Sequence, residues 1–463
     1  MRFGSLGGFM KTLLNRLFKL EERKSKAPIE IIAGLITFLA MIYILPTNSS
    51  ILGDMGMSKE GVFAATAIVS GIVSIIMGLY GNFPVILSAG MGVNAYLAYT
   101  IFGQMGDSWT AALLLMFLAG IIFLIITLTP IRTMIINAIP NDLKYIISAG
   151  LGGFIAFVGL KNSGIIVASG GTLVPLGDFS NPATLLAVFG VLIVFVLLAV
   201  KVKWINQMAI PIAMVVTAVI GVIASALLPD ATGLPSFGGN FGLSGLEDVA
   251  FKIFDGDDWV AVLTNPASYG IIFSLIFVNL FDTTATLMAV GRGAGMVDKE
   301  GTLLGGKKAV LADAIGAAIC APLGTSTVTS FAESGIAVET GAKTGLAAVT
   351  AGVLFLLSAF IYPVFSIFSS YAVTSMALIS VGALMFFGNL RDINWDDRVV
   401  VYTAFITVVM MILTYSISDG LGFGLILYIA MMLARKQGKQ ISPTLYVVGV
   451  LFLTYYVLKV FIK

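Results

Sequence analysis

Three carboxylates lie within long apolar stretches of the sequence, away from the ends of those stretches: Asp282, Asp313 and Glu333. A charge at the centre of a bilayer costs on the order of 2.5–3.5 kcal/mol on the lenient insertion scales. No lysine or arginine falls within the same stretches to pair with these acids. Protonation, a half-helix N-terminus or a bound ligand must therefore stabilise them. The pattern indicates a site for a cation or for a polar molecule with N–H groups, and disfavours an inorganic anion.

A polar stripe surrounds the first of these acids in the segment FVNLFDTTATL. Asn279, Asp282, Thr283 and Thr286 are spaced i, i+3, i+4 and i+7, so a helix places them on one face. We expect Asp282, Asn279 and Thr286 to contact a substrate. The alternative is a structural hydrogen-bond seam between two helices, which threonine and asparagine often form.

Glu333 follows a stretch, Leu323–Glu333 (LGTSTVTSFAE), that cannot form an ordinary transmembrane helix. Its small hydroxyl residues and β-formers predict a short extended piece. Irregular backbone at membrane depth survives only where it lines a protein cavity. We therefore expect Glu333 to begin a half-helix and to face a ligand; the alternative is an acid at a helix start near solvent.

Two other segments could supply the same site. In SAGMGVNAYLAY, Gly90 and Gly92 allow close backbone approach, and Asn94 offers both a donor and an acceptor. The alternative for Asn94 is a polar contact between helices. Asp313 lies in VLADAIGAAICA, where alanine and glycine allow close helix packing. It contacts the central site or locks two helices together, and the sequence leaves both options open.

The elements that must position these residues belong to a polytopic membrane protein. Of the 463 residues, 58% are hydrophobic and 11% are charged. A net charge of +2 is too small to indicate nucleic-acid binding. The chain has no histidine, which removes the usual metal ligand and leaves proton chemistry to carboxylates. We expect no metal, no cofactor and no enzymatic activity, because no nucleophile–base constellation is present.

Apolar segments predict an all-α fold of fourteen membrane spans, seven before and seven after an acidic loop. The predicted parts are a basic N-terminal helix (1–28), a first repeat (29–228), an extracytoplasmic loop (229–262), a second repeat (263–437) and a hydrophobic tail helix (438–463). Lysine and arginine concentrate in alternate loops, which places the N-terminus in the cytoplasm. Residues 442–461 could form a further span, but we favour a helix packed along the inner surface.

An odd number of spans in each half makes the second half inverted relative to the first. A faint repeat agrees, since aligning Gly71–Gly92 with Ala314–Gly335, an offset of 243 residues, matches several small and apolar residues. The third and tenth spans, the two that look interrupted, occupy equivalent places. Corresponding interrupted segments are the best sequence indicator of a transporter's central site.

Five motifs together resemble the nucleobase–cation symporter-2 family, specifically its AzgA-like purine permease branch. They are FVNLFDTTATL, LLGGKKAVLADAIGA, LGTSTVTSFAESG, LSAGMGVNAYLAYT and LTPIRTMIINAIP. The resemblance covers roughly residues 27–440. It implies two inverted seven-segment repeats, with a core domain that includes segments 1–4 and 8–11 and moves against a gate domain. It also implies short strands that break segments 3 and 10 and meet near the midplane.

The resemblance also implies roles for individual residues. Asp282 and Glu333 would be the binding carboxylates, Asn94 a polar contact, and Ala332 and Ala89 would present backbone groups beside the ring. This sequence departs from the branch at Asn279, which is usually a second acid, and near Ala89, where a proline is usual. The first departure affects proton stoichiometry or purine preference. Candidates for proton coupling are Asp282, Glu333 and Asp313, and the sequence does not choose among them.

We therefore expect proton-coupled import of purine nucleobases by alternating access, guanine and hypoxanthine first, adenine second, and xanthine or uracil third. The alternatives are an anion or organic-acid carrier of the same architecture, and a passive channel. Expected partners are the nucleobase, protons and the lipid bilayer, with a homodimer left open and no nucleic acid. The expected location is the inner cell membrane.

Overall fold

The computed structural model describes residues 12–256, 258–297 and 303–461, and its regular structure is almost entirely helical. Within these residues, 9 helical segments are long and apolar enough to cross a membrane. They are Ala27–Gly53, Lys59–Gly81, Trp109–Leu128, Asn141–Asn162, Pro182–Ala199, Ala209–Leu227, Pro266–Gly293, Tyr371–Leu390 and Ile417–Ala434. Three shorter apolar helices, Leu346–Ser358, Arg398–Leu413 and Pro443–Val457, accompany them. The chain is thus a multi-pass membrane protein.

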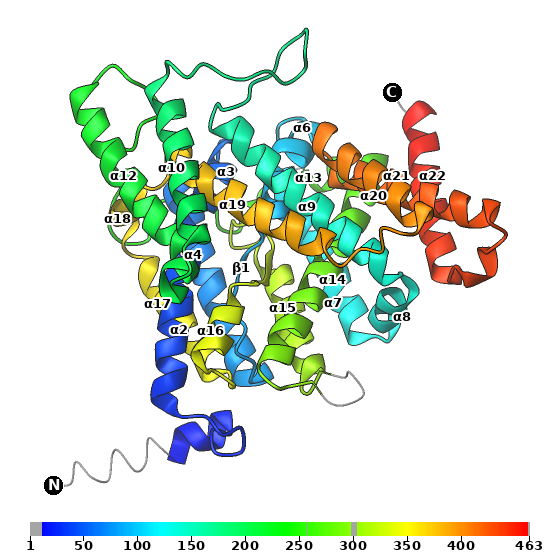
Figure 1. Ribbon diagram of the computed structural model, residues 1–463, viewed down its shortest axis with the longest axis horizontal. Helices are drawn as coiled ribbons and strands as arrows, with labels where there is room; N and C mark the ends of the chain where they lie inside the picture. The colour runs from blue at the N-terminus through cyan, green and yellow to red at the C-terminus, as the bar shows by residue number, and fades with distance from the viewer. Residues whose placement is uncertain (1–11, 257, 298–302, 462–463) are drawn as a thin grey trace.

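The helices separate into two groups by their packing (Figure 1). The core group comprises α2 (Ala27–Met41), α3 (Ile44–Gly53), α4 (Lys59–Ile76), η1 (Met77–Gly81), β1 (Leu87–Ala89), α5 (Met91–Tyr96), η2 (Leu97–Ile101), α6 (Phe102–Gln104), α7 (Trp109–Leu128), α14 (Pro266–Gly293), α15 (Gly306–Ile319), β2 (Val328–Ser330), α16 (Ser334–Thr340), α17 (Leu346–Ser358) and α18 (Tyr362–Ser366). The gate group comprises α9 (Asn141–Asn162), α10 (Pro182–Ala199), α12 (Ala209–Leu227), α19 (Tyr371–Leu390), α20 (Arg398–Leu413) and α21 (Ile417–Ala434).

Short elements connect or flank these groups: α8 (Ile131–Ala138), α11 (Lys203–Gln207), η3 (Lys252–Phe254), α13 (Asp258–Thr264), η4 (Gly438–Gln440) and α22 (Pro443–Phe461). The most extensive packing in the gate group is between α9 and α19, and α20 also packs on α9 and α21. In the core group α17 packs on α4 and α2, and α15 packs on α7. The division follows the one that the family resemblance implies.

The strands β1 and β2 pair antiparallel near the centre of the molecule (Figure 1). The register joins Leu87 to Ser330, Ser88 to Thr329 and Ala89 to Val328. The two strands predicted in the third and tenth segments are therefore present. A two-stranded ribbon leaves backbone groups free on its outer edges, and these need partners when no water is near.

Helix α4 supplies partners to the free edge of β1. The Ser74 hydroxyl contacts both the backbone N–H of Leu87 at 3.0 Å and its carbonyl oxygen at 3.1 Å. One turn earlier, the Ser70 and Ser88 hydroxyls lie 2.8 Å apart. These buried hydroxyls hold the strand against an otherwise apolar helix.

Each strand leads into a short half-helix. Helix α5 begins at Met91 and helix α16 at Ser334, which are 243 residues apart. This spacing equals the offset of the sequence repeat, whereas the strands β1 and β2 begin at Leu87 and Val328, which are 241 residues apart.

The expectation that no basic side chain is available to pair with the three acids is wrong, because the buried Arg132 interacts electrostatically with Asp313. Arg132 on α8 is only 5% exposed, because α8 folds back against α14 instead of extending as a loop. Its guanidinium donates to the Thr127 and Thr284 hydroxyls at 3.2 and 3.4 Å. It also lies 5.2 Å from the centre of the Phe123 ring. These contacts hold the charged guanidinium of Arg132 inside the protein.

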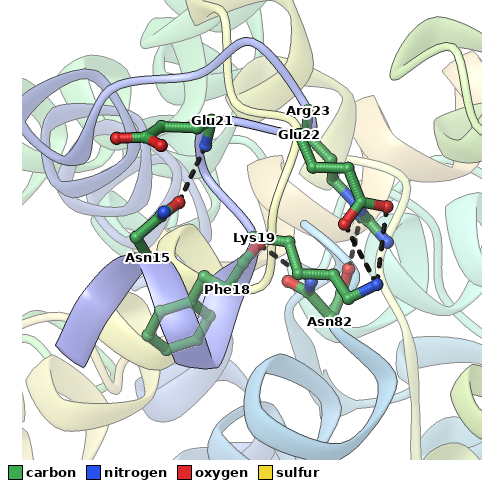
Figure 2. Close-up of polar contacts among 7 residues, drawn as sticks. All are labelled: Asn15, Phe18, Lys19, Glu21, Glu22, Arg23 and Asn82. Atoms are coloured by element: carbon green, nitrogen blue, oxygen red, sulfur yellow. Dashed lines mark hydrogen bonds and ion pairs between the residues drawn. The ribbon is translucent and has the colours of Figure 1, made fainter. Parts of the chain in front are cut away.

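The basic N-terminal segment is helical over 12–18 and folds onto the core group, while residues 1–11 lie outside the described part (Figure 2). Arg23 donates to the carbonyl oxygens of Asn82 and Lys343 at 2.7 and 2.9 Å. Burial lowers the pKa of this guanidinium. The Asn82 side chain in turn donates to the carbonyl oxygen of Phe18 at 2.9 Å. The segment thereby joins the end of η1 to the loop before α17.

Candidate functional site

The stretch 325–333, which contains β2, contacts or contains nearly all of the predicted site residues. Asp282, on the facing helix α14, accepts a hydrogen bond from the hydroxyl of Thr329 in the middle of β2. Helix α14 carries the polar stripe that includes this acid, and it packs against both β2 and α16. The fold therefore brings the acid of the eighth segment onto the strand of the tenth.

Glu333 lies at the N-cap of α16, as the sequence predicts for the start of a half-helix. One of its carboxylate oxygens accepts a hydrogen bond from the Tyr43 hydroxyl at 2.6 Å. Tyr43 lies in the short break between α2 and α3 and is 1% exposed. A charge-assisted hydrogen bond of this length fixes the carboxylate and stabilises its ionised form.

Asn94 lies in the first turn of α5, directly after β1, and is fully buried. Its amide nitrogen donates to the side-chain oxygen of Asn48 on α3 at 2.8 Å. Ser326 donates to that same Asn48 oxygen at 3.1 Å. The side-chain oxygen of Asn94 accepts no hydrogen bond from the described residues. A buried acceptor without a partner costs about 1–3 kcal/mol, so a ligand that donates to it gains correspondingly.

Asn279 repeats this arrangement on α14. Its amide nitrogen lies 3.4 Å from the Thr327 hydroxyl, and its side-chain oxygen is buried without a partner in the described part of the chain. Asn279 thus contacts Thr327 directly, and Asn94 is linked to the preceding residue, Ser326, through Asn48. Thr286, two turns beyond Asn279 on the helix, is 8% exposed. Its position continues the polar stripe of α14.

Asp313 on α15 has donors on both carboxylate oxygens. Thr283 on α14 donates to one oxygen at 2.6 Å, and Ser330 on β2 donates to the other at 2.9 Å. The side chain is 1% exposed. Asp313 on α15 therefore contacts the helix α14, as the helix-locking option requires, and also the strand β2, so both options of the sequence stay open.

The predicted site has an open half and an enclosed half. Ala332 is exposed, and Glu333 and Asp282 are partly exposed. Ala89 and Asn94 are fully buried. The two acids are therefore more accessible than the predicted site residues of β1 and α5.

A separate cavity of about 580 Å³ lies elsewhere, between the core and gate groups, and is lined in part by Glu60, Asn162 and Tyr371. None of the predicted site residues lines it. Within the described ranges, no group of three or more His, Cys, Asp or Glu side chains could hold a metal ion.

Sequence reasoning missed Tyr43 and Asn48. Both lie in the first apolar segment, where the run Asn48–Ser50 interrupts an otherwise hydrophobic stretch. That polar run was a usable signal, because uncharged polar groups at such depth need partners. Tyr43 gave no comparable signal, since a tyrosine in an apolar segment is common.

The core and gate groups also contact each other through a cluster of polar side chains. Asp54 at the end of α3 accepts hydrogen bonds from Tyr371 on α19 at 2.5 Å and from Tyr99 on η2 at 2.9 Å. Asn162 of α9 donates to the Tyr99 hydroxyl at 2.5 Å. Few of these bonds lie within one group, so relative motion of the groups would break them.

Comparisons with known proteins agree with this architecture. A model of a permease family matches residues 28–423. The chain is 39% identical to the guanine/hypoxanthine permease PbuG of Bacillus subtilis, covering 96% of this chain and 99% of that one. It is 38% identical to the adenine permease AdeQ of Escherichia coli, covering 95% of each.

Among solved structures, the transmembrane domain of a cyanobacterial bicarbonate transporter, BicA, superposes with a TM-score of 0.63. The match covers 84% of this chain and 96% of that domain at 14% sequence identity. At this identity the likeness concerns the fold alone.

Proposed function

This chain belongs to the nucleobase–cation symporter-2 family of permeases, in its AzgA-like branch, and from that premise we propose that it imports purine nucleobases by proton symport. It is a transporter and not an enzyme. Guanine and hypoxanthine are the proposed substrates, with adenine next. The relatives named above divide between these substrates, so the family alone does not choose one.

The arrangement of acceptors around β2 is the observation that carries the proposal. Asp282 and Glu333 supply carboxylates, while Asn94 and Asn279 supply amide oxygens that accept no hydrogen bond from the residues the structure describes. A purine base carries at least two N–H groups in one plane and can satisfy more than one of these acceptors at once. An analogue that lacks one N–H would leave a buried acceptor unpaired, which is how such sites discriminate.

The same arrangement disfavours an anion carrier. An anion would require donors or positive charge where this site presents acceptors. Arg132 is buried, but it hydrogen-bonds to two threonine hydroxyls, lies beside a phenylalanine ring and interacts electrostatically with Asp313. The likeness to a bicarbonate transporter concerns the fold and says nothing of the ligand.

We propose alternating access in which the core group moves against the gate group. The strands, the half-helices and both acids belong to the core group, so the site would move as a unit. Protonation of Asp282 or Glu333 would let that acid donate as well as accept a hydrogen bond, and so change which edge of the nucleobase it can bind. Proton binding would thereby be coupled to nucleobase binding. Asp313, with both oxygens engaged, would transmit such a change between α14 and β2.

The finer architecture is part of the proposal. Fourteen spans in two inverted repeats would require the two strand-broken segments, α15, α17 and α20 to cross along with the nine long segments, with residues 442–461 outside the count. The half-helices α5 and α16 begin 243 residues apart, the same offset as in the sequence alignment, and this supports such a repeat. We place the protein in the inner cell membrane with a cytoplasmic N-terminus, and leave a homodimer open.

Removing either acid tests the site. Asp282→Asn and Glu333→Ala should reduce hypoxanthine uptake to background, because each removes a carboxylate that accepts a substrate N–H or the coupled proton. Uptake of radiolabelled hypoxanthine is measured in cells lacking their own purine permeases. Surface labelling and size-exclusion profiles confirm insertion and folding. Uptake at the unmodified level by both variants would refute the assignment.

A further inference from the structure

The hydrogen positions in the cluster around Asn48 are fixed by counting donors. The hydroxyl oxygens of Thr66 and Thr325 lie 2.7 Å apart, and the Thr66 oxygen lies 2.6 Å from the carbonyl oxygen of Val62. Two oxygens this close need a hydrogen between them. A carbonyl oxygen cannot supply it, so the single Thr66 hydrogen points to Val62.

The remaining hydrogens follow from that one. Because the only hydroxyl hydrogen of Thr66 is donated to Val62, the Thr325 hydroxyl must donate to the Thr66 oxygen. Both hydroxyl oxygens can then only accept from Asn48, which lies 2.8 Å from Thr66 and 2.9 Å from Thr325. The group of Asn48 that faces them is therefore its NH₂, and its oxygen faces the opposite way.

The orientation of Asn48 fixes that of Asn94. The Asn48 oxygen accepts from Ser326 and lies 2.8 Å from the Asn94 amide. Only the NH₂ group of Asn94 can face that oxygen, since two amide oxygens at this distance would repel each other. The Asn94 oxygen must then point away from Asn48, and it is the buried acceptor that lacks a partner in the described part of the chain.

We propose that Thr66 and Asn48 are positioning residues that hold Asn94 as an obligatory acceptor, so that the bound base must donate an N–H to it. This inference rests on the proposed function. It assigns specificity to residues on α3 and α4 that need not touch the substrate. The chain of hydrogen bonds runs from the Val62 carbonyl through Thr66 and Asn48 to Asn94.

Two isosteric substitutions separate hydrogen ordering from general packing. Thr66→Val removes the hydroxyl tied to Val62 and frees the Thr325 hydrogen, so Asn48 and Asn94 can both reverse. Thr325→Val removes a hydroxyl of the same shape from the same cluster, but Thr66 still donates to Val62 and still fixes Asn48. Thr66→Ser restores the order.

The readout is a ratio of affinities for ligands that differ in donor pattern. Hypoxanthine carries N1–H beside a carbonyl, whereas adenine carries a bare N1 beside an amino group; 7-deaza- and 9-deazahypoxanthine alter the imidazole edge. Competition against radiolabelled hypoxanthine is measured on the purified transporter. Asn94→Ala identifies the informative pair of ligands: it is the pair whose affinity ratio falls when the Asn94 side chain is removed. Asn94→Ser replaces this variant if Asn94→Ala is unstable.

We expect Thr66→Val to reduce that ratio by about tenfold, the effect of stranding one buried hydrogen-bonding group. Thr325→Val and Thr66→Ser should keep it within about twofold. An unchanged ratio in Thr66→Val, or an equal loss in Thr325→Val, would overturn the inference. Failure of the unmodified transporter to bind any purine base would instead refute the proposed function.

Discussion

At the scale of single residues, the site combines acids that the sequence predicts with partners that it does not. Asp282, Glu333 and Asn94 are conspicuous as polar groups in apolar segments. Their partners Tyr43, Asn48 and Thr329 become visible only when α3, β2 and α14 come together. The polar run at Asn48 indicates that it needs a partner, but a single sequence does not show which residue that partner is, whether it lies 46 positions away as in Asn48–Asn94 or 290 as in Tyr43–Glu333.

The Tyr43 hydroxyl offers a test at this scale. Tyr43→Phe keeps the ring but removes the donor to Glu333, and should raise the KM for hypoxanthine by about tenfold through loss of a charge-assisted hydrogen bond. Initial uptake rates over a range of hypoxanthine concentrations give KM and maximal rate.

Tyr415→Phe is the matched control, because the Tyr415 hydroxyl is buried without a hydrogen-bond partner among the described residues. Its KM should stay within about twofold of the unmodified value. Equal effects of the two substitutions would show that Tyr43 acts through general packing and not through Glu333.

At the scale of elements, hydrophobic length and polar interruption predicted much of the fold. Both short strands lie where hydroxyl-rich sequence interrupts an apolar segment, and α16 begins at the residue after Glu333. The prediction failed at Arg132, where the sequence reads as a loop and the chain forms a helix folded against α14. Tertiary packing decides that case, and local sequence does not report it.

The junction made by Asn82 gives a prediction for this scale. Its side chain donates to the carbonyl oxygen of Phe18 (Figure 2). It also accepts from the backbone N–H of Gly345 at 2.7 Å, and the φ of Asn82 is +48°. Asn82→Gly should lose about 2 kcal/mol from two hydrogen bonds. Asn82→Ala should lose about 1 kcal/mol more, because alanine strains in the left-handed region.

Thermal unfolding of the purified protein in one detergent measures this order. The expected Tm falls from the unmodified protein to Asn82→Gly and further to Asn82→Ala. Asn240→Ala, in an exposed loop, should leave Tm unchanged. A Tm for Asn82→Ala above that of Asn82→Gly would contradict the argument from backbone conformation.

At the scale of the whole molecule, the packing of the helices into a core and a gate group is what makes transport plausible on physical grounds. The site residues belong to one group, and polar contacts such as Tyr371 to Asp54 join it to the other. Breaking and remaking contacts of this kind allows two discrete arrangements instead of a continuous deformation. Composition predicted the membrane class, but which helices pack together is a property of the folded chain.

Proton-driven accumulation is the most direct test of the central claim. The purified protein is reconstituted into liposomes with an acidic exterior, and uptake of radiolabelled hypoxanthine is followed with and without a protonophore. Proton symport predicts that hypoxanthine accumulates inside the liposomes above its external concentration, and that this accumulation collapses when the protonophore is added. Uptake that only equilibrates hypoxanthine and ignores the protonophore would contradict it.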